Sequence, residues 1–444
     1  MNVEILSLER QGASHIKKNL ICQDSAGSKR LHDGSIILAL SDGHGSSPHF
    51  RSDRGSRIAV ECALEALEEF ASRFKESMLP GVGCSSLLQQ GTLAEQPAPV
   101  SAEADEIFRH LGAAILYRWE RRVYEDWLAC SLSEAERKLI DPKDFESLKR
   151  DDRRAVMRVY GCTLQAAVRT STYWFALHFG DGKIVAFRKD GSVYEPVPWD
   201  KDCFTNITTS LCEIEPRTMR YCYGVDLDEV SALFLASDGM DDSFGTPEEL
   251  YSCYGIDFLG RVHAKGWDYL AQNVAKRLDN YSQYYSGDDM SIACWVDLDA
   301  IRGMMPRILN DKREICVKKI NHYKSRLDIL TRERDSLLKK RNDLNEQVNK
   351  NKSVKSVFAD FYSKIKSWCE EHREEPSSFA NTEEALLKDN KRNDEEIRHR
   401  TEELMRIDIE IKLREESIEK LQRALENAEK ELRSVENYRN SLSD

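Results

Sequence analysis

Short apolar segments alternate with turns along residues 1–300, and this pattern predicts a domain of mixed strands and helices. The segments with strand character are bounded by glycine-bearing turns. They cover residues 3–8, 35–41, 162–169, 172–179, 183–188, 231–237 and 290–297. Helical periodicity is found at 55–74, 103–128 and 266–280, and residues 80–100 form a predicted irregular loop. Strands interspersed with a few long helices favour a layered α+β fold.

The remaining chain, residues 301–444, has the seven-residue apolar repeat of paired helices. Apolar side chains recur every seven residues over 397–432, with companions three positions later. A weaker repeat covers 320–348, and the segment 351–382 between them is richer in aromatic side chains. The pattern predicts an all-α coiled-coil region, most simply an antiparallel helical hairpin with its tip at 351–382. Pairing of either segment with another chain is the alternative, since sequence determines the period better than the partner.

Charge separates the same two parts of the chain. The net charge is −12, and residues 1–300 carry 33 basic and 47 acidic side chains, against 32 and 30 in 301–444. We therefore predict two domains with a boundary at residue 300. An acidic chain argues against nucleic acid or a membrane surface as the partner. No apolar run approaches the ~18 residues of a membrane span.

The chain is also expected to be cytoplasmic. The N-terminal sequence "MNVEILSLERQG" lacks the basic and apolar regions of a secretory signal. The twelve cysteines are scattered, without CxxC pairs or zinc-site spacing. Several stand inside apolar runs, where a reduced cysteine behaves as a small hydrophobic residue. This usage is typical of a reducing compartment.

Acidic residues stand where several predicted strands begin or end. Asp42 ends the run "SIILALSD" and Asp238 ends "SALFLASD", each before a glycine. Asp288 and Asp289 precede the last predicted strand, and Asp181 lies between two apolar runs, as in a hairpin turn. Carboxylates that converge at one end of a sheet repel one another, so their pKa values rise or they bind a cation. Oxygen ligands of this kind suit Mg²⁺ or Mn²⁺.

Each of these motifs has an ordinary explanation when it is taken alone. Asp-Gly is a frequent turn sequence, so "SDG" and "FGDGK" are individually turns. "GDDMS" would be a solvated loop, and His44 a loop histidine. The joint occurrence of the acids, each next to an apolar strand, is what favours a metal site.

The ordered motifs resemble those of the metal-dependent type 2C protein serine/threonine phosphatases (the PPM family), especially its bacterial members. The resemblance covers roughly residues 1–300. It rests on "QD" at 23–24, "DGHG" at 42–45, "GCTLQAAV" at 161–168 leading to "FGDGKIVAFR", "LASDGMDD" at 235–242 and "DDMSIACWV" at 288–296. It implies a β-sandwich of two antiparallel sheets flanked by helices, with a two-metal site at one end.

The resemblance also implies a role for each matching residue. The positions that correspond to metal-binding motifs are Gln23, Asp24, Asp42, Gly43, Asp181, Asp238, Asp242 and Asp288. Asp42 would bridge two Mn²⁺ or Mg²⁺ ions, and Asp181 and Asp242 match positions that bind a third ion in some members. His44 matches the family's general acid. The implied reaction is hydrolysis of a phosphomonoester by metal-activated water, without a phosphoenzyme.

Two positions depart from the family pattern. The family usually has Glu-Asp where this chain has Gln23-Asp24, and a neutral amide offers an oxygen but a weaker field. The family also often has a phosphate-binding arginine where this chain has Asn19. Lys17, Lys18 and His15 are the candidate replacements, although a lysine lacks the bidentate fork of arginine.

Three functions of different classes follow from these observations. The first is an active phosphatase for phosphoserine and phosphothreonine in proteins, with a coiled-coil arm that recognises substrate or partner. The second is an inactive module that binds phosphoproteins, and the third is a scaffold acting through the coiled coil. A phosphatase implies a phosphorylated protein substrate and a cognate serine/threonine kinase. Self-association through the arm is a further expectation.

Overall fold

The structure is a computed structural model, and it describes residues 2–74, 83–84, 102–197, 203, 208–213, 219–372 and 380–442. The chain divides into two units, Met1–Lys312 and Arg313–Asp444. Each unit is described by itself below.

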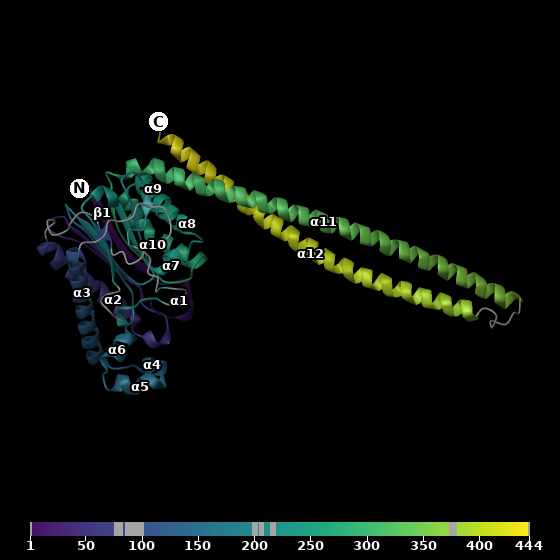
Figure 1. Cartoon of the computed structure of the whole chain (residues 1–444), viewed down its shortest axis with the longest axis horizontal. Coiled ribbons are helices and arrows are strands. Elements are labelled where there is room, and N and C mark those ends of the chain that lie inside the picture. The colour runs from purple at the N-terminus through teal and green to yellow at the C-terminus, as the bar shows by residue number, and fades with distance from the viewer. Residues whose placement is uncertain are drawn as a thin grey trace. The chain divides into compact units, whose positions relative to one another are not determined.

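Two antiparallel β-sheets form the centre of the first unit (Figure 1). One sheet has the strand order β1-β11-β10-β7-β8, and the other has the order β2-β3-β5-β6-β9-β4. The strands are β1 (Val3–Arg10), β2 (Ser25–Arg30), β3 (Ile36–Ser41), β4 (Gly83–Cys84), β5 (Leu164–Arg169), β6 (Trp174–Phe179), β7 (Lys183–Phe187), β8 (Val193–Tyr194), β9 (Arg220–Gly224), β10 (Ala232–Ala236) and β11 (Met290–Asp297).

The side chains of β3 show why the sheets stack as layers. Side chains of a strand alternate between the two faces of its sheet. Leu38 and Leu40 belong to the apolar core between the sheets, which also contains Trp295. Ile37 and Ala39 belong to a second core that the helices α2 (Ser52–Arg73) and α3 (Ala102–Ala129) cover. Because both faces of β3 are buried, its sequence "IILALS" is continuously apolar up to its last residue.

Helices cover the outer faces of both sheets. Phe234 of β10 stacks on Tyr254 and meets Phe258 edge-on, which closes the outer face of its sheet. The α-helices of this unit are α1 (Ala13–Lys18), α2 (Ser52–Arg73), α3 (Ala102–Ala129), α4 (Glu134–Leu139), α5 (Pro142–Lys149), α6 (Arg153–Val159), α7 (Asp238–Asp241), α8 (Pro247–Ser252), α9 (Gly260–Lys265) and α10 (Trp267–Tyr284). A π-helix spans Cys253–Leu259, and short 3-10 helices span Ser47–His49, Leu211–Glu213 and Leu227–Val230. The fold is therefore the helix-flanked β-sandwich that the sequence predicted.

All seven predicted strands and all three predicted helices are present. The strand β2 was not predicted, because its sequence "SAGSKR" lacks β-branched residues. The short helices α4, α5 and α6 were also missed, and we call residues 134–159 the helical insert. The predicted loop at 80–100 lies mostly outside the described residues, and Gly83–Cys84 within it pairs with β9.

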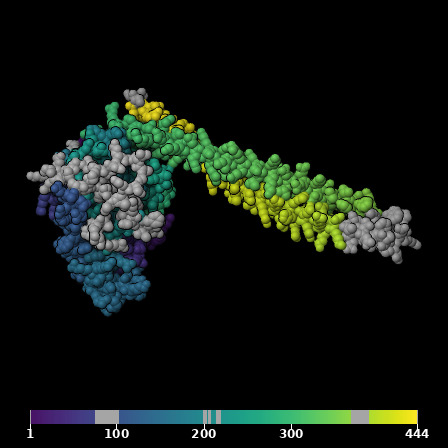
Figure 2. Space-filling model, in the orientation of Figure 1, coloured from purple at the N-terminus to yellow at the C-terminus, as the bar shows by residue number. Residues whose placement is uncertain are grey.

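Two long helices, α11 (Ile301–His372) and α12 (Ala380–Ser441), form an all-α extension (Figures 1 and 2). Leu344 of α11 packs against Ile407 and Ile411 of α12. The ion pairs Lys340–Glu403, Lys355–Asp394 and Arg414–Glu333 show that residue numbers rise on one helix as they fall on the other. The helices are thus antiparallel, and residues 351–372 continue α11 rather than forming a separate element.

Two surface features bear on the sequence predictions. Phe358, Phe361 and Tyr362 of α11 are exposed. Within the described part of the chain, we find no helix that combines the length and the apolar character needed to cross a membrane.

Candidate active site

One open cleft of about 610 Å³ gathers the residues that the sequence singled out. Its lining includes Gln23, Asp24, Asp42, Gly43, His44, Asp181, Asp238, Asp242, Asp288 and His15. These residues are up to 273 positions apart in sequence, between His15 and Asp288. Lys17 and Lys18 are exposed on α1 and do not contribute to this lining.

Backbone pairing between β3 and β5 places Asp42. The Asp42 amide donates to Thr163 Oγ1 at 2.9 Å, and the Thr163 amide donates to the Asp42 carbonyl at 2.8 Å. Gly43 forms a bridge with Cys162, and a Cβ at Gly43 would lie 2.6 Å from the Gln23 carbonyl oxygen. A side chain at position 43 has no space, which explains the glycine after the acid.

Asp181 does not lie on a hairpin, so that sequence prediction was wrong. The strands on either side of it belong to different sheets, because β6 pairs with β5 and β9 while β7 pairs with β10 and β8. Gly180 has a φ of +121°, a conformation that suits glycine, at the point where the chain crosses between sheets. The crossing brings Asp181 to the same cleft as Asp42.

Asp238 and Asp288 come from the ends of two neighbouring strands. Asp238 begins α7 directly after β10, and Asp288 precedes β11. The Ser237 amide donates to the Ser291 carbonyl at 3.2 Å, and Ser237 Oγ accepts from the Ser291 amide at 3.0 Å. These two bonds hold the end of β10 beside the start of β11.

The carboxylates of the cleft interact strongly. Burial raises the pKa of Asp42, and the nearby Asp24 and Asp238 raise it further. Burial also raises the pKa of Asp238 to about 7, and Asp181, Asp288 and Asp242 add to the increase. Asp42 and Asp238 lie within hydrogen-bonding reach of one another. Without a cation these groups cannot all ionise, because each negative charge disfavours the next.

Asp24 provides a test of whether a metal suits this site. Its side chain is buried, its Oδ2 makes no hydrogen bond, and burial raises its pKa. A buried carboxylate oxygen without a donor is costly unless a cation binds it. The donors are carboxylates and carbonyls, the ligands of Mg²⁺ and Mn²⁺. The residues therefore fit divalent ions.

The arrangement of the acids suits divalent ions that keep some of their water ligands. Among the described residues, no three His, Cys, Asp or Glu side chains form a compact ligand cluster. The acids instead surround a wide cleft. Mg²⁺ usually keeps several waters and takes only one or two carboxylates directly, so an open arrangement of this kind is compatible with it.

Gln23 is held by the start of α2. Its Nε2 donates to Ser52 Oγ at 2.9 Å, and its carbonyl accepts from Ser56 Oγ at 2.6 Å. With the amide nitrogen engaged in this way, the Oε1 of Gln23 is its available ligand atom. The site therefore keeps an oxygen donor at this position without the charge of a glutamate.

Histidines are the only basic residues among the described residues that line the cleft. Of its described lining residues none is lysine or arginine, and three are histidine: His15, His44 and His49. His15 Nδ1 lies 2.9 Å from Asp289 Oδ1. Burial, with a smaller effect from His49, lowers the pKa of His44 to about 4. His49 had no sequence signal of its own, since it lies outside the "DGHG" motif.

Asp289 has a role that the sequence did not reveal. Its side chain is buried, and it accepts from the Gly12 amide and the Gln23 amide, both at 2.6 Å. Asp288 is about half exposed, accepts from the Asp289 amide at 2.8 Å, and has its Oδ1 3.9 Å from His15 Nε2. Both acids line the cleft, but of the two it is Asp289 that binds the amides of the N-terminal segment. The doubled acid in "GDD" was the only available signal.

A sequence model of the family Protein phosphatase 2C matches residues 11–279, more than half of the chain. The chain belongs to this family. The matched range contains Asp42, His44 and Asp238, and it ends before Asp288. No curated protein matches the sequence.

Solved structures similar to the chain at low sequence identity include two serine/threonine phosphatases. The serine/threonine phosphatase Stp1 from Staphylococcus aureus is 15% identical, with a TM-score of 0.38 and coverage of 67% of this chain and 95% of that chain. The catalytic domain of PstP, solved with two manganese ions, is 16% identical, with a TM-score of 0.36 and coverage of 66% and 97%. RsbX, solved with magnesium, is 11% identical, with a TM-score of 0.34 and coverage of 66% and 94%. The family assignment rests on the sequence model alone.

Proposed function

We propose that this protein hydrolyses phosphoserine and phosphothreonine in protein substrates, with two Mn²⁺ or Mg²⁺ ions and a third at Asp181 and Asp242. The observation that supports this best is the gathering of the family's acids and His44 around one cleft. Acids with raised pKa values in an open cleft are a frequent property of active sites.

Asp42, the Gly43 carbonyl, Asp238 and Asp288 would hold the two ions, with Asp24 and Gln23 beside them. When bound, such ions polarise the phosphoryl oxygens and lower the pKa of a water molecule toward neutrality. Burial and the neighbouring carboxylates raise the pKa values of Asp42 and Asp238, which favours their protonated forms when no cation is bound. Metal loading and deprotonation of these acids are therefore coupled.

His44 would donate the proton that the departing serine or threonine oxygen needs. In the overall step the phosphorus gains a bond to water oxygen and loses its bond to the side-chain oxygen, which takes the proton. His15 is the phosphate-binding candidate that lines the cleft, whereas Lys17 and Lys18 are exposed and do not line it.

The substrate would be a phosphorylated protein, with a serine/threonine kinase acting in the opposite direction. The extension formed by α11 and α12 would recognise the substrate or a partner, and its exposed Phe358 and Phe361 are suited to protein contact. We expect this chemistry in the cytoplasm.

The test is hydrolysis of a phosphothreonine peptide with Mn²⁺, with Mg²⁺ and with a chelator. Metal-dependent turnover that Asp238→Asn abolishes would support the proposal. Asp299→Asn is the matched control, because Asp299 is exposed, accepts a hydrogen bond from Asn2 and is not part of the described cleft lining. Absence of turnover in the folded protein would favour the alternative of a phosphoprotein-binding module.

A truncated chain would separate the roles of the two units. The truncation belongs after Lys312 rather than after residue 300, because Met304, Met305 and Leu309 are fully buried. Retained hydrolysis with loss of partner binding would support a separable recognition arm. Loss of hydrolysis would instead show that the extension is needed for catalysis.

A further inference from the structure

The ring of His44 lies against a second histidine ring that no motif includes. The His44 and His49 rings meet edge-on, with their centroids 4.8 Å apart and an interplanar angle of 66°. Both rings line the same cleft. We call His44 and His49 the histidine pair.

A short segment before β5 holds both members of the pair. The His44 amide donates to the Gly161 carbonyl at 3.1 Å. His49 Nδ1 lies 2.5 Å from the Arg158 carbonyl oxygen, and because a carbonyl only accepts, this nitrogen carries the proton. A Cβ at Gly161 would lie 2.4 Å from His49 Nδ1 and 2.8 Å from His44 Cδ2. The absence of a side chain at position 161 therefore makes the space that the pair fills.

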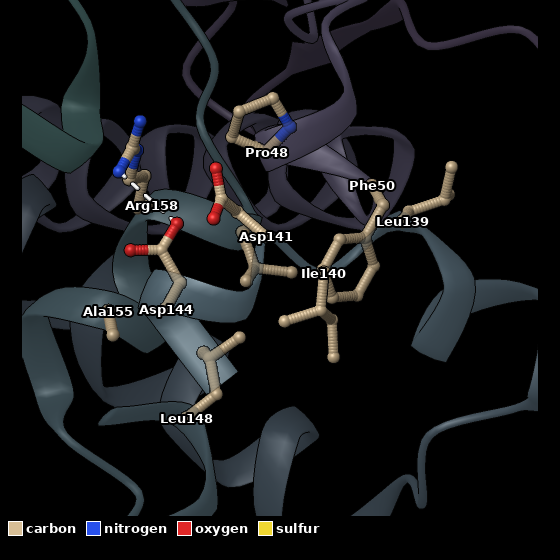
Figure 3. A pocket seen from close by; sticks show the side chains of 10 residues that line it. Pro48, Phe50, Leu139, Ile140, Asp141, Asp144, Leu148, Ala155 and Arg158 are labelled. Carbon is tan, nitrogen blue, oxygen red and sulfur yellow. Dashed lines mark hydrogen bonds and ion pairs between the residues drawn. The ribbon is translucent and has the colours of Figure 1, made fainter. Parts of the chain in front are cut away.

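The helical insert packs against the residues on either side of His49. The neighbours of His49 in sequence, Pro48 and Phe50, line a cavity of about 20 Å³ together with Ile140 and Leu148 of the insert (Figure 3). Figure 3 shows Phe50 beside Ile140, with Arg158 reaching toward Asp144. So small a cavity holds at most one water molecule, so the loop and the insert are close to full contact.

A buried arginine fixes the insert to the start of α2. Arg51 donates to Glu136 Oε1 at 2.6 Å and to the Tyr160 hydroxyl at 2.9 Å, and its guanidinium lies 5.1 Å from the centre of the Trp127 ring. Tyr160 in turn donates to Asp126 Oδ2 at 2.6 Å. This network connects α2, α3, α4 and the segment that holds the histidine pair.

We propose that His49 is a positioning residue for His44, and that the helical insert sets the orientation of the pair. This inference rests on the proposed function, because it holds that His49 orients the His44 ring toward the departing oxygen. General acids contribute about 10²–10⁴-fold to rate when they are well placed. A loosened ring would lose part of that factor without affecting metal binding.

The experiment compares two substrates that differ in their need for a proton. A phosphothreonine peptide releases an alkoxide and requires a general acid, whereas p-nitrophenyl phosphate releases a stabilised anion and does not. For His49→Ala we expect kcat on the peptide to fall about 10- to 100-fold, with less than about 3-fold change on p-nitrophenyl phosphate. His44→Ala should show the same selectivity. The double variant should be no slower than His44→Ala, because residues that act as a unit are not additive.

Two further variants complete the design. Leu148→Ala enlarges the cavity under Phe50 without touching the cleft, and we expect a smaller loss with the same substrate selectivity. His110→Ala is the control, since His110 is exposed on α3 away from the cleft, and we expect no change.

The outcomes separate the two proposals. Wild-type protein without metal-dependent turnover of either substrate would overturn the proposed function. Active wild-type protein with an unchanged His49→Ala variant would overturn the positioning role alone. An equal loss on both substrates, or a raised requirement for Mn²⁺, would also overturn it, because that pattern indicates damage to the metal site.

Discussion

Replacement of Asp289 should destabilise the N-terminal segment, whereas the same change at Asp288 should not. Asp289 accepts hydrogen bonds from the amides of Gly12 and Gln23, which are more than 260 residues away in sequence. Asp288 accepts a hydrogen bond from the amide of its neighbour and is about half exposed. The two positions form a matched pair of adjacent acids with different surroundings.

The magnitude follows from the two hydrogen bonds. An amide bonded to a charged acceptor contributes about 1.5–3 kcal/mol, and leaving it buried without a partner adds a desolvation cost. Asp289→Ala removes both acceptors, so we expect about 3–5 kcal/mol of destabilisation, allowing for non-additivity. Asp289→Asn keeps one acceptor oxygen and turns an NH₂ group toward the other amide, which should cost about 2 kcal/mol. Asp288→Asn should stay within about 0.5 kcal/mol of wild type.

Hydrogen exchange and urea unfolding would measure these differences. Both should be done with chelator present, so that metal binding contributes nothing to stability. We expect faster exchange of the residue 12 and 23 amides in the Asp289 variants and wild-type rates in Asp288→Asn. Unchanged exchange in Asp289→Ala would refute the assignment, and so would an equal effect of both asparagine variants.

Three further predictions concern other parts of the chain. Arg51 lowers the pKa of Glu136 to about 2, below its ordinary 4.5. The ionised carboxylate therefore stabilises the fold above pH 4.5, and this contribution is lost as the pH falls toward 2. The difference in unfolding free energy between wild type and Glu136→Gln should shrink by about 1–2 kcal/mol over that range, and a constant difference would contradict the prediction. Ile411→Ala should destabilise the α11–α12 unit by about 2–3 kcal/mol in thermal unfolding, while Ile409→Ala at an exposed position should change little. Gly55→Ala would place a Cβ 2.0 Å from the Tyr160 carbonyl oxygen, and we expect at least about 3 kcal/mol of destabilisation in urea, with wild-type stability as the contrary result.

The strands and the acids at their ends could be predicted from the sequence. Fully buried strands read as continuous apolar runs, and β3 and β10 do so up to the residues just before Asp42 and Asp238. The repeat in the second part likewise predicted two long helices, because the period of a helix is a local property. Strand and helix patterns of this kind depend on residues that are close in sequence and on burial, and the apolar content of each segment reports burial directly.

The connections between distant residues could not be predicted in this way. The sequence "FGDGK" is compatible with a hairpin between β6 and β7 and also with a crossing between two sheets. Long-range packing, rather than the turn sequence, determines which strands pair. The helical insert is short and largely polar, so its apolar periodicity is weak. Its position under His49 depends on the buried Arg51 network.

The local sequence is enough to identify the charged residues, the buried runs and hence the acids that end strands. Long-range packing, by contrast, is what brings Asp289 rather than Asp288 to the N-terminal amides and places His49 against His44. The physical reason is that these contacts join elements whose approach is set by the packing of two sheets and their helices. Interactions between residues that are close in sequence carry no information about that packing.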